Sequence, residues 1–357
     1  MKNLFVKRTL CIMLSVLMAA CAFTLTACGE QSIKAQKEND SPAGTILQET
    51  EDSLTIVDQA GREVTVGKDI ESIALCYRVV IRFLLSLDQG DKITGIGKTE
   101  DFLEELQPSL KECADVGKGV ADIEALAELK PDLFFHKASD VETLEAVEEI
   151  GIPAVGIEIE TPEDMLTALD LMGKVCGAEE KADALRKYYN DRLGSIAEMT
   201  SVIDNKKSAV IMGSSIGKVA DGTMLQGEMI ERAGGINCAE ELEATELWPS
   251  AGAEQIFAWN PEYIFITNSE SASYTVDDIL KDPAWSEIEA VKNRHVYVMP
   301  AEKDSWEFPG IVSVLGIEYM IRVMYPQLLS DDEFEADVNE LYELSYGRTF
   351  DRSELGY

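Results

Sequence analysis

GAEEKADALRKYYNDRLGSIAEMTSVI, residues 177–203, decides the fold because it predicts one long, uninterrupted helix. Its apolar residues recur at steps of three and four, which places them on one helical face: Ala182, Leu185, Tyr189, Leu193, Ile196, Met199 and Ile203. Glu179 and Glu180 lie in the first turn, where the helix dipole favours acidic residues. At 1.5 Å per residue the helix would be roughly 40 Å long, enough to join two domains as a rod.

The same short pattern occurs on both sides of this helix. Residues 123–135 read IEALAELKPDLFF and residues 253–266 read AEQIFAWNPEYIFI. Each copy predicts a short amphipathic helix that opens with a glutamate, then a turn containing proline and an acid, then an apolar strand, which is the order of an α/β unit. Glu124 and Glu254 occupy the same place in the two copies. Chance repetition of a common connection is the alternative.

The first 27 residues have a basic start, an apolar run and a small-residue end, which predicts a secretory signal peptide. The run closes with Leu25-Thr-Ala-Cys28, which resembles the lipobox of bacterial lipoproteins. In that motif the cysteine is diacylated, so Cys28 is the expected lipidation site. An uncleaved anchor is the alternative, although the run is slightly shorter than the ~20 residues that a membrane span needs.

Residues 28–53 are predicted to be a disordered tether, because they hold hardly any large apolar residue. The formal net charge moves from −35 to −38 once residues 1–27, with three basic and no acidic residues, are removed. Such an acidic chain repels phosphate, so it is a poor partner for anionic lipid headgroups and nucleic acid, and no nucleic-acid partner is expected. The four remaining cysteines have no metal-site spacing and leave the disulfide state open: Cys76, Cys113, Cys176 and Cys238.

Strands alternate with helices along the rest of the chain, which predicts parallel sheets covered by helices. We expect an N-terminal lobe over residues 54–176, the rod over 177–203, a C-terminal lobe over 204–346 and a short tail over 347–357. Residues 54–66 alternate apolar and polar positions about a turn and predict a hairpin at the start of the first lobe.

Taken together, the lipobox, the hairpin VDQAGREVTV, the two glutamate-helix-proline-strand units, the rod helix and AGGIN resemble substrate-binding lipoproteins of ATP-driven (ABC) importers for ferric siderophores, haem and cobalamin. YTVDDILKDPAW and VKNRHVYVMPAEKDSW are similar to the family's C-terminal lobe. The resemblance covers nearly all of residues 54–346. One departure is Leu75-Cys-Tyr-Arg78, which stands where family members often have a turn rich in serine and proline.

This resemblance implies an α/β fold of two Rossmann-like lobes with parallel sheets, joined by one long helix, with the ligand between them. It also implies a monomer that is not an enzyme, has no cofactor of its own and is held outside the cytoplasm on the cell membrane. Glu124 and Glu254 would pair with arginines of the permease, although an acid at a helix start is also favoured by the dipole alone.

Basic residues follow the predicted strands, whose carboxyl ends converge on one cleft: Arg78, Lys98, Lys118, His136, Lys137, Lys218 and Lys303. In a chain with 31 basic and 66 acidic residues, this recurrence favours a pocket for an anion. Charged loops exposed to solvent are the alternative. Tyr77 and Trp306, with Tyr274 and Trp248, are candidate aromatic residues of the cleft.

Other chemistries are less well supported. Gly213–Gly217 has the G-x-S-x-G pattern of a hydrolase with Ser215 as the nucleophile, but a turn rather than a helix is expected after it. The chain has only two histidines, which excludes a multi-histidine metal site. His136 is expected to be a polar pocket residue, with axial haem ligation as the alternative.

The sequence therefore predicts a binding lipoprotein that delivers an anionic, iron-containing chelate of the siderophore type to an importer. Molybdate or tungstate, haem and a corrinoid are alternative ligands. A lipoprotein esterase and a surface adhesin are the alternatives of other classes.

Overall fold

The computed structural model describes residues 41–242, 247–267 and 273–357. The predicted signal peptide and Cys28 lie outside these residues. The predicted α/β fold with two parallel sheets is confirmed.

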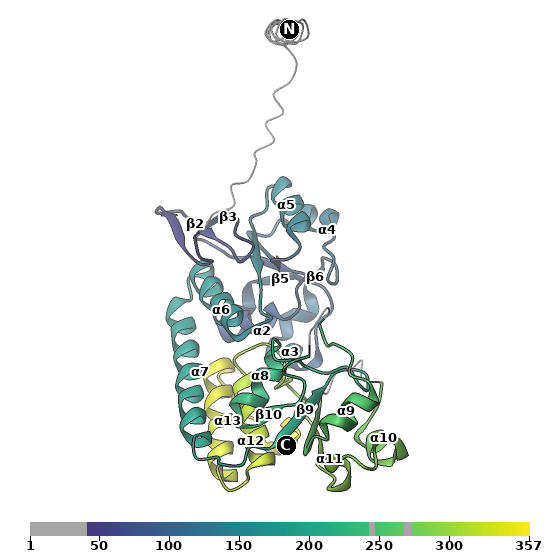
Figure 1. The fold of residues 1–357 in the computed structure, drawn as a ribbon. Coiled ribbons are helices and arrows are strands. Elements are labelled where there is room, and N and C mark those ends of the chain that lie inside the picture. The colour runs from purple at the N-terminus through teal and green to yellow at the C-terminus, as the bar shows by residue number, and fades with distance from the viewer. Residues whose placement is uncertain (1–40, 243–246, 268–272) are drawn as a thin grey trace, which may run out of the picture. The chain divides into compact units, whose positions relative to one another are not determined.

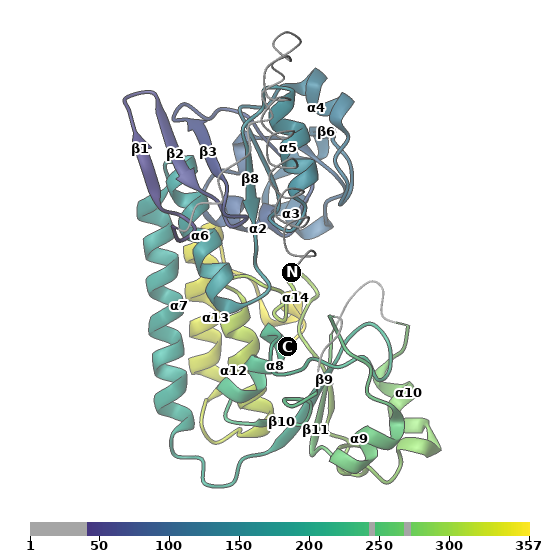
Figure 2. The same ribbon diagram turned by 45° about the horizontal axis from the view of Figure 1, so that its top comes forward.

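The sheet of the N-terminal lobe has five parallel strands in the order β6-β5-β4-β7-β8. Its strands are β4 (Ile73–Leu75), β5 (Ile93–Ile96), β6 (Ala114–Asp115), β7 (Leu133–Lys137) and β8 (Ala154–Ile157). Of these strands, β5 and β6 are labelled in Figure 1 and β6 and β8 in Figure 2. The chain builds outward from β4 to one side and then returns to β4's other side with β7. This reversal of strand order is where open parallel sheets bind ligands.

The sheet of the C-terminal lobe has four parallel strands in the order β10-β9-β11-β12, with its own reversal beside β9. Its strands are β9 (Ser208–Met212), β10 (Ile236–Asn237), β11 (Tyr263–Ile266) and β12 (Val296–Val298). A separate antiparallel sheet contains β1 (Ile46–Glu49), β2 (Ser53–Val57) and β3 (Glu63–Gly67). The β2–β3 pair is the predicted hairpin.

Helices cover both sheets. Those of the first lobe are α2 (Val80–Ser86), α3 (Asp101–Leu106), α4 (Ile123–Leu129), α5 (Val141–Glu149) and α6 (Pro162–Cys176). Those of the second are α8 (Leu225–Arg232), α9 (Ala253–Trp259), α10 (Val276–Lys281), α11 (Glu289–Lys292), α12 (Ser313–Met324), α13 (Asp331–Tyr346) and α14 (Arg352–Leu355). Short 3-10 turns are η1 (Gly90–Lys92), η2 (Pro108–Glu112) and η3 (Pro283–Trp285).

The predicted rod is α7 (Glu179–Thr200), a helix of 22 residues and about 33 Å. It packs against α6 of the first lobe and against α8, α12 and α13 of the second (Figure 2). Close packing on α6 depends on Gly173, where an added Cβ would lie 2.6 Å from the Ala182 side chain. One apolar core continues from the first sheet through α2, α6 and α7 to α12 and α13, so the lobes share buried side chains.

The repeated pattern seen in the sequence has the same geometry in both lobes. α4 and α9 each end at a non-glycine residue in the left-handed conformation, Lys130 with φ 52° and Asn260 with φ 47°. Proline and an acid follow in both. The two units are therefore equivalent in backbone conformation as well as in sequence.

The acid of each unit holds a serine at the start of the neighbouring strand. The Ser72 amide and hydroxyl donate to Asp132 Oδ2 at 2.8 and 2.7 Å, and the Ser208 amide donates to Glu262 Oε2 at 3.1 Å. In return the Asp132 and Glu262 amides donate to the serine hydroxyl oxygens. Each clamp fixes the amino-terminal edge of its sheet, opposite the edge where ligands bind.

Two sequence expectations need correction. Residues 46–49, predicted to belong to the tether, form β1 and pair antiparallel with β2, because backbone hydrogen bonds replace the missing apolar burial. Residues 347–357, predicted only as a short tail, contain α14 and pack on the second lobe, where the Tyr357 ring lies 5.1 Å from those of Trp306 and Phe334.

Candidate functional site

A cavity of about 1110 Å³ lies where the carboxyl ends of strands from both lobes face each other. Its walls come from the loops after β4, β5 and β6 in the first lobe and after β9, β11 and β12 in the second. Small-molecule sites span about 300–1,000 Å³, so this cavity can accept a bulky ligand. Its position matches the rule that parallel sheets bind ligands beyond their carboxyl ends.

Five of the predicted basic residues line this one cavity: Arg78, Lys98, Lys118, Lys218 and Lys303. The carboxylates of its lining are Glu100, Asp101, Glu302 and Glu307. Cations thus slightly outnumber acids here, although acids outnumber bases by about two to one in the whole chain. The strand order brings these cations together from loops that lie as far as 225 residues apart in the numbering, between Arg78 and Lys303.

Two of these cations, Arg78 and Lys303, have acidic partners. Arg78 Nη1 lies 3.1 Å from Glu100 Oε1, and the Arg78 side chain is 38 % exposed. Lys303 of the second lobe pairs with Glu105 of α3 in the first. The hydrogen bond from Lys303, with that from Arg348, lowers the pKa of Glu105. An anionic ligand must compete with these carboxylates for the same N–H donors.

Tyr77 and Trp248 give the cavity aromatic surface. The Lys137 ammonium lies 5.0 Å from the centre of the Tyr77 ring, a cation–π contact. Burial, reinforced by Glu160 and Glu158, raises the pKa of Tyr77, so its hydroxyl stays protonated. Burial also raises the pKa of the Cys76 thiol to about 12, which leaves it a neutral donor to the Val116 carbonyl at 3.1 Å.

The structure places three predicted site residues away from the cavity lining. His136 is buried, and its Nε2 lies 2.9 Å from Asp140 Oδ2 within the first lobe. Trp306 is also buried, and its indole N–H donates to the Tyr342 hydroxyl at 3.0 Å. Lys137 does not line the cavity, and its link to the site is its contact with the Tyr77 ring. His136 and Lys137 are the last two residues of β7 and Trp306 follows β12, but the side chains of His136 and Trp306 turn into the core.

Tyr274, a weaker aromatic candidate, is buried as well, and its hydroxyl donates to the Gly213 carbonyl at 2.9 Å. It supports the loop after β9 from behind. The same loop carries Ser214 and Ser215 on the cavity wall.

The G-x-S-x-G segment has the geometry of a turn. Gly217 has φ 82°, and the Lys218 amide donates to the Ser215 carbonyl at 3.0 Å. His295 precedes β12, at the opposite edge of the sheet from Ser215, and stacks on Tyr263 at 4.5 Å. Within the described ranges neither histidine can therefore serve Ser215 as a base.

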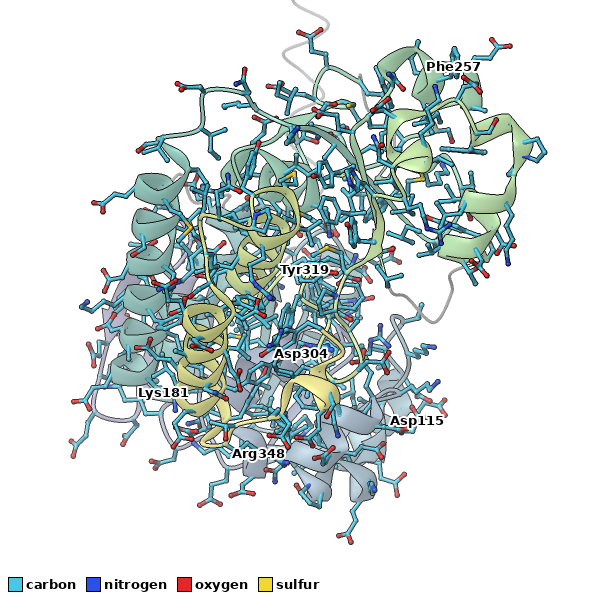
Figure 3. The ribbon with its side chains drawn as sticks, turned by 90° about the horizontal axis from the view of Figure 1, so that it is seen from below. Asp115, Lys181, Phe257, Asp304, Tyr319 and Arg348 are labelled. Atoms are coloured by element: carbon cyan, nitrogen blue, oxygen red, sulfur yellow. The ribbon has the colours of Figure 1, made fainter. Side chains whose placement is uncertain are left out.

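Glu124 and Glu254 are exposed in the first turns of α4 and α9. Both helices run antiparallel to their strands, so their first turns lie at the sheet edges that carry the cavity. Phe257, one turn after Glu254, is 53 % exposed (Figure 3). The sequence pattern had singled out the acids but gave no indication that this aromatic ring would be exposed.

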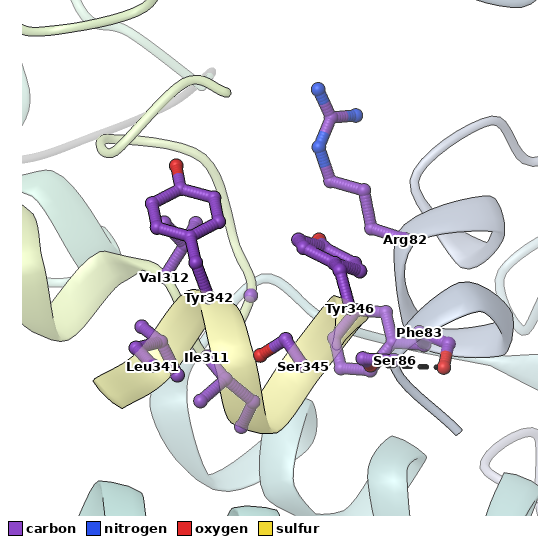
Figure 4. Close-up of a pocket in the computed structure, with 10 residues that line it drawn as sticks. Arg82, Phe83, Ser86, Ile311, Val312, Leu341, Tyr342, Ser345 and Tyr346 are labelled. Carbon is purple, nitrogen blue, oxygen red and sulfur yellow. Dashed lines mark hydrogen bonds between the residues drawn. The ribbon is translucent and has the colours of Figure 1, made fainter. Parts of the chain in front are cut away.

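A buried ion pair behind the cavity escaped sequence reasoning. Arg82 of α2 donates from Nε to Asp304 Oδ1 at 2.8 Å, and their side chains are 4 % and 0 % exposed. Asp304 lies in the interior of the molecule (Figure 3), and the Tyr346 ring stands beside the Arg82 stem (Figure 4). Because 222 residues separate the partners, no local pattern could have paired them.

No three His, Cys, Asp or Glu side chains in the described part of the chain are grouped so as to hold a metal ion. Across those same residues, no helix has the length and apolar character of a membrane span.

Comparison with known proteins agrees with this geometry. The molybdate-binding protein MolA of Haemophilus influenzae is 24% identical over 331 residues, 83% of this chain and 91% of its own length. An iron-uptake system-binding protein of Bacillus subtilis is 26% identical over 306 residues, 80% and 90% of the two chains. The crystal structure of a periplasmic solute binding protein from Veillonella parvula superposes with a TM-score of 0.74 at 27% identity, covering 85% and 95%.

Two parallel-sheet lobes, a long connecting helix and a cavity between strand ends define a solute-binding protein that works outside the cytoplasm. A family model described as periplasmic binding protein matches residues 73–303, and the chain belongs to this family. It is a substrate-binding protein of an ABC transporter, and its family consists of non-enzymatic transporter components.

Proposed function

We propose that this protein captures an anionic iron chelate of the siderophore type in the cavity and delivers it to the permease. The observation that carries the proposal is the gathering of Arg78, Lys98, Lys118, Lys218 and Lys303 on one cavity of a strongly acidic protein. Ion pairing is worth more in such a partly dry site than in bulk water. The cavity volume and the rings of Tyr77 and Trp248 favour a chelate larger than a simple oxyanion.

Molybdate or a similar oxyanion is the second candidate. It is supported by the name of the Haemophilus influenzae relative and by the hydroxyls of Thr99, Ser214 and Ser215 on the cavity wall. A tetrahedral oxyanion needs only a few donors close together, so it would occupy a small part of the cavity. Haem and a corrinoid remain as bulky alternatives.

We expect Arg78→Ala and Lys218→Ala each to weaken binding of the anion about ten- to a hundredfold, because each removes a charged donor. Isothermal titration of the apo protein with ferric catecholate, ferric citrate, molybdate, haem and cyanocobalamin identifies the ligand and measures the loss. Lys111→Ala is the matched control, since this exposed lysine pairs with Glu104 outside the cavity. Unchanged binding of a neutral or cationic ligand in both cavity variants would contradict the proposal.

We also propose that Glu124 and Glu254 dock on basic residues of the permease. Glu124→Ala and Glu254→Ala should each reduce uptake by cells, and lysine should be worse than alanine because it sets like charges against each other. The affinity of the purified protein for its ligand should not change. Glu198→Ala, an exposed acid near the far end of α7, is the control. Normal uptake with the double alanine variant would refute the docking role.

The proposal includes attachment to the membrane through lipid on Cys28. One acyl chain binds only marginally, so two or more are needed for stable attachment. A parent protein found wholly in the culture medium would contradict this anchor.

A further inference from the structure

Glu100 occupies an unusual place between two arginines at the cavity wall. It lies in the loop after β5, directly before the first residue of α3, and its side chain is 21 % exposed. Oε1 lies 3.1 Å from Arg78 Nη1, and Oε2 accepts a hydrogen bond from Arg82 Nη2. One carboxylate thus joins an arginine of the cavity to an arginine of the interior.

The interior arginine, Arg82, is held next to Glu100 by buried contacts. Arg82 is 4 % exposed, and its Nε is held by the fully buried Asp304 at 2.8 Å. Its guanidinium also lies 5.8 Å from the centre of the Phe308 ring. Arg82 therefore fixes the Glu100 carboxylate in front of Arg78, whose own side chain is 38 % exposed and able to turn.

We propose that Glu100 is a specificity-determining residue that acts as a built-in carboxylate ligand of Arg78. Arg–carboxylate pairing is the contact that a carboxylate solute would make at this wall. A simple carboxylate solute gains little binding free energy at Arg78, because it must displace the Glu100 carboxylate to make the same contact. A ligand that makes several further contacts across the cavity offsets the cost of displacing Glu100. Glu100 thus selects against small free carboxylates by a competing contact rather than by shape.

This inference rests on the proposed anion-binding function and adds the class of solute that the site rejects. Glu100→Gln keeps an oxygen acceptor for Arg82 and removes the charge that competes at Arg78. We expect this variant to bind free citrate at least about tenfold more tightly than the parent, measured by isothermal titration. Glu100→Ala should also bind free citrate more tightly than the parent. It replaces the glutamine variant in the experiment if thermal unfolding shows that the glutamine variant does not fold.

Glu112→Gln is the matched control, because Glu112 is exposed and lies outside the cavity lining. It removes the same charge without touching Arg78, so we expect less than about a twofold change in citrate affinity. In Arg78→Ala protein, adding Glu100→Gln should change citrate affinity no more than Glu112→Gln does, since the arginine that Glu100 pairs with is gone.

The outcomes separate this inference from the function on which it rests. If the parent binds an anion through Arg78 but Glu100→Gln behaves like Glu112→Gln, or binds citrate more weakly, Glu100 is not a competitor. If ferric catecholate, ferric citrate, molybdate and free citrate bind neither the parent nor any variant, the proposed function fails and the inference with it.

Discussion

Arg82→Met should lower the free energy of unfolding by about 3–5 kcal/mol, because it leaves the carboxylate of Asp304 buried without its cationic partner. The Asp304 side chain is 0 % exposed, and its Oδ1 accepts from Arg82 Nε at 2.8 Å. Arg82 comes from α2 of the first lobe and Asp304 from the loop after β12 of the second. The pair therefore also connects the two lobes, in addition to α7, the shared apolar core and the Lys303–Glu105 pair. Urea denaturation of the purified protein measures the loss.

The double variant Arg82→Met/Asp304→Asn should regain much of that stability. Removing both charges ends the desolvation cost, and well-packed neutral replacements of buried pairs are often close to neutral. Lys187→Met is the control, because the Lys187–Asp191 pair is 76 % and 63 % exposed and should contribute less than about 1 kcal/mol. A single variant no less stable than this control would mean that the pair does not hold the lobes together.

Stability should fall as the pH rises from about 4.5 to 7, and Glu318 of α12 should account for roughly 2–4 kcal/mol of the fall. Burial raises the pKa of Glu318 from 4.5 to about 7, against the attraction of Arg192. Arg192 of α7 also pairs with Asp337 of α13, so two carboxylates share one guanidinium. Burial raises the pKa of Asp337 as well.

The direction of this pH dependence follows from the number of protons bound to the folded and unfolded states. Between pH 4.5 and 7 the folded protein holds a proton on Glu318 that the unfolded chain has lost, so raising the pH favours unfolding until both forms are ionised. Oε2 of Glu318 is buried with no hydrogen-bond partner among the described residues, and this oxygen can carry the proton.

Glu318→Gln cannot titrate and should lack this part of the pH dependence, as seen in urea denaturation at pH values from 4 to 8. Glu343→Gln, which changes an exposed acid of α13, should keep the parent's profile. Parallel profiles for the parent and Glu318→Gln would show that Glu318 has the same pKa in the folded and unfolded protein, so that the attraction of Arg192 cancels the effect of burial.

Features with a local cause were predictable from the sequence. The α7 helix was predicted with its ends within three residues, because its apolar face, first-turn acids and preceding glycine are all local. The two repeated units were equally predictable from the sequence, since proline and an acid mark the turn in each. Five cations were placed on one cavity because parallel strands bring their carboxyl ends to one edge.

Features that depend on distant partners were not predictable. Trp306 follows a strand end like Lys303, yet it is buried because the hydroxyl of Tyr342 and the rings of α13 receive it. The role of Glu100 was not predicted, because it depends on the contacts that Glu100 makes with both Arg78 and Arg82. β1 was missed because edge pairing with β2 needs little apolar character.

The attachment of Gly44, two residues before β1, also limits how far the protein can stand from the membrane. The Gly44 amide donates to the Val57 carbonyl, and the Gly44 carbonyl accepts from Lys174. With Cys28 lipidated as we propose, sixteen residues connect lipid to body and can span at most about 55 Å. A tether running to residue 53 would have allowed about 90 Å. Each molecule thus searches a thinner layer above the membrane, and its local concentration at a permease is correspondingly higher.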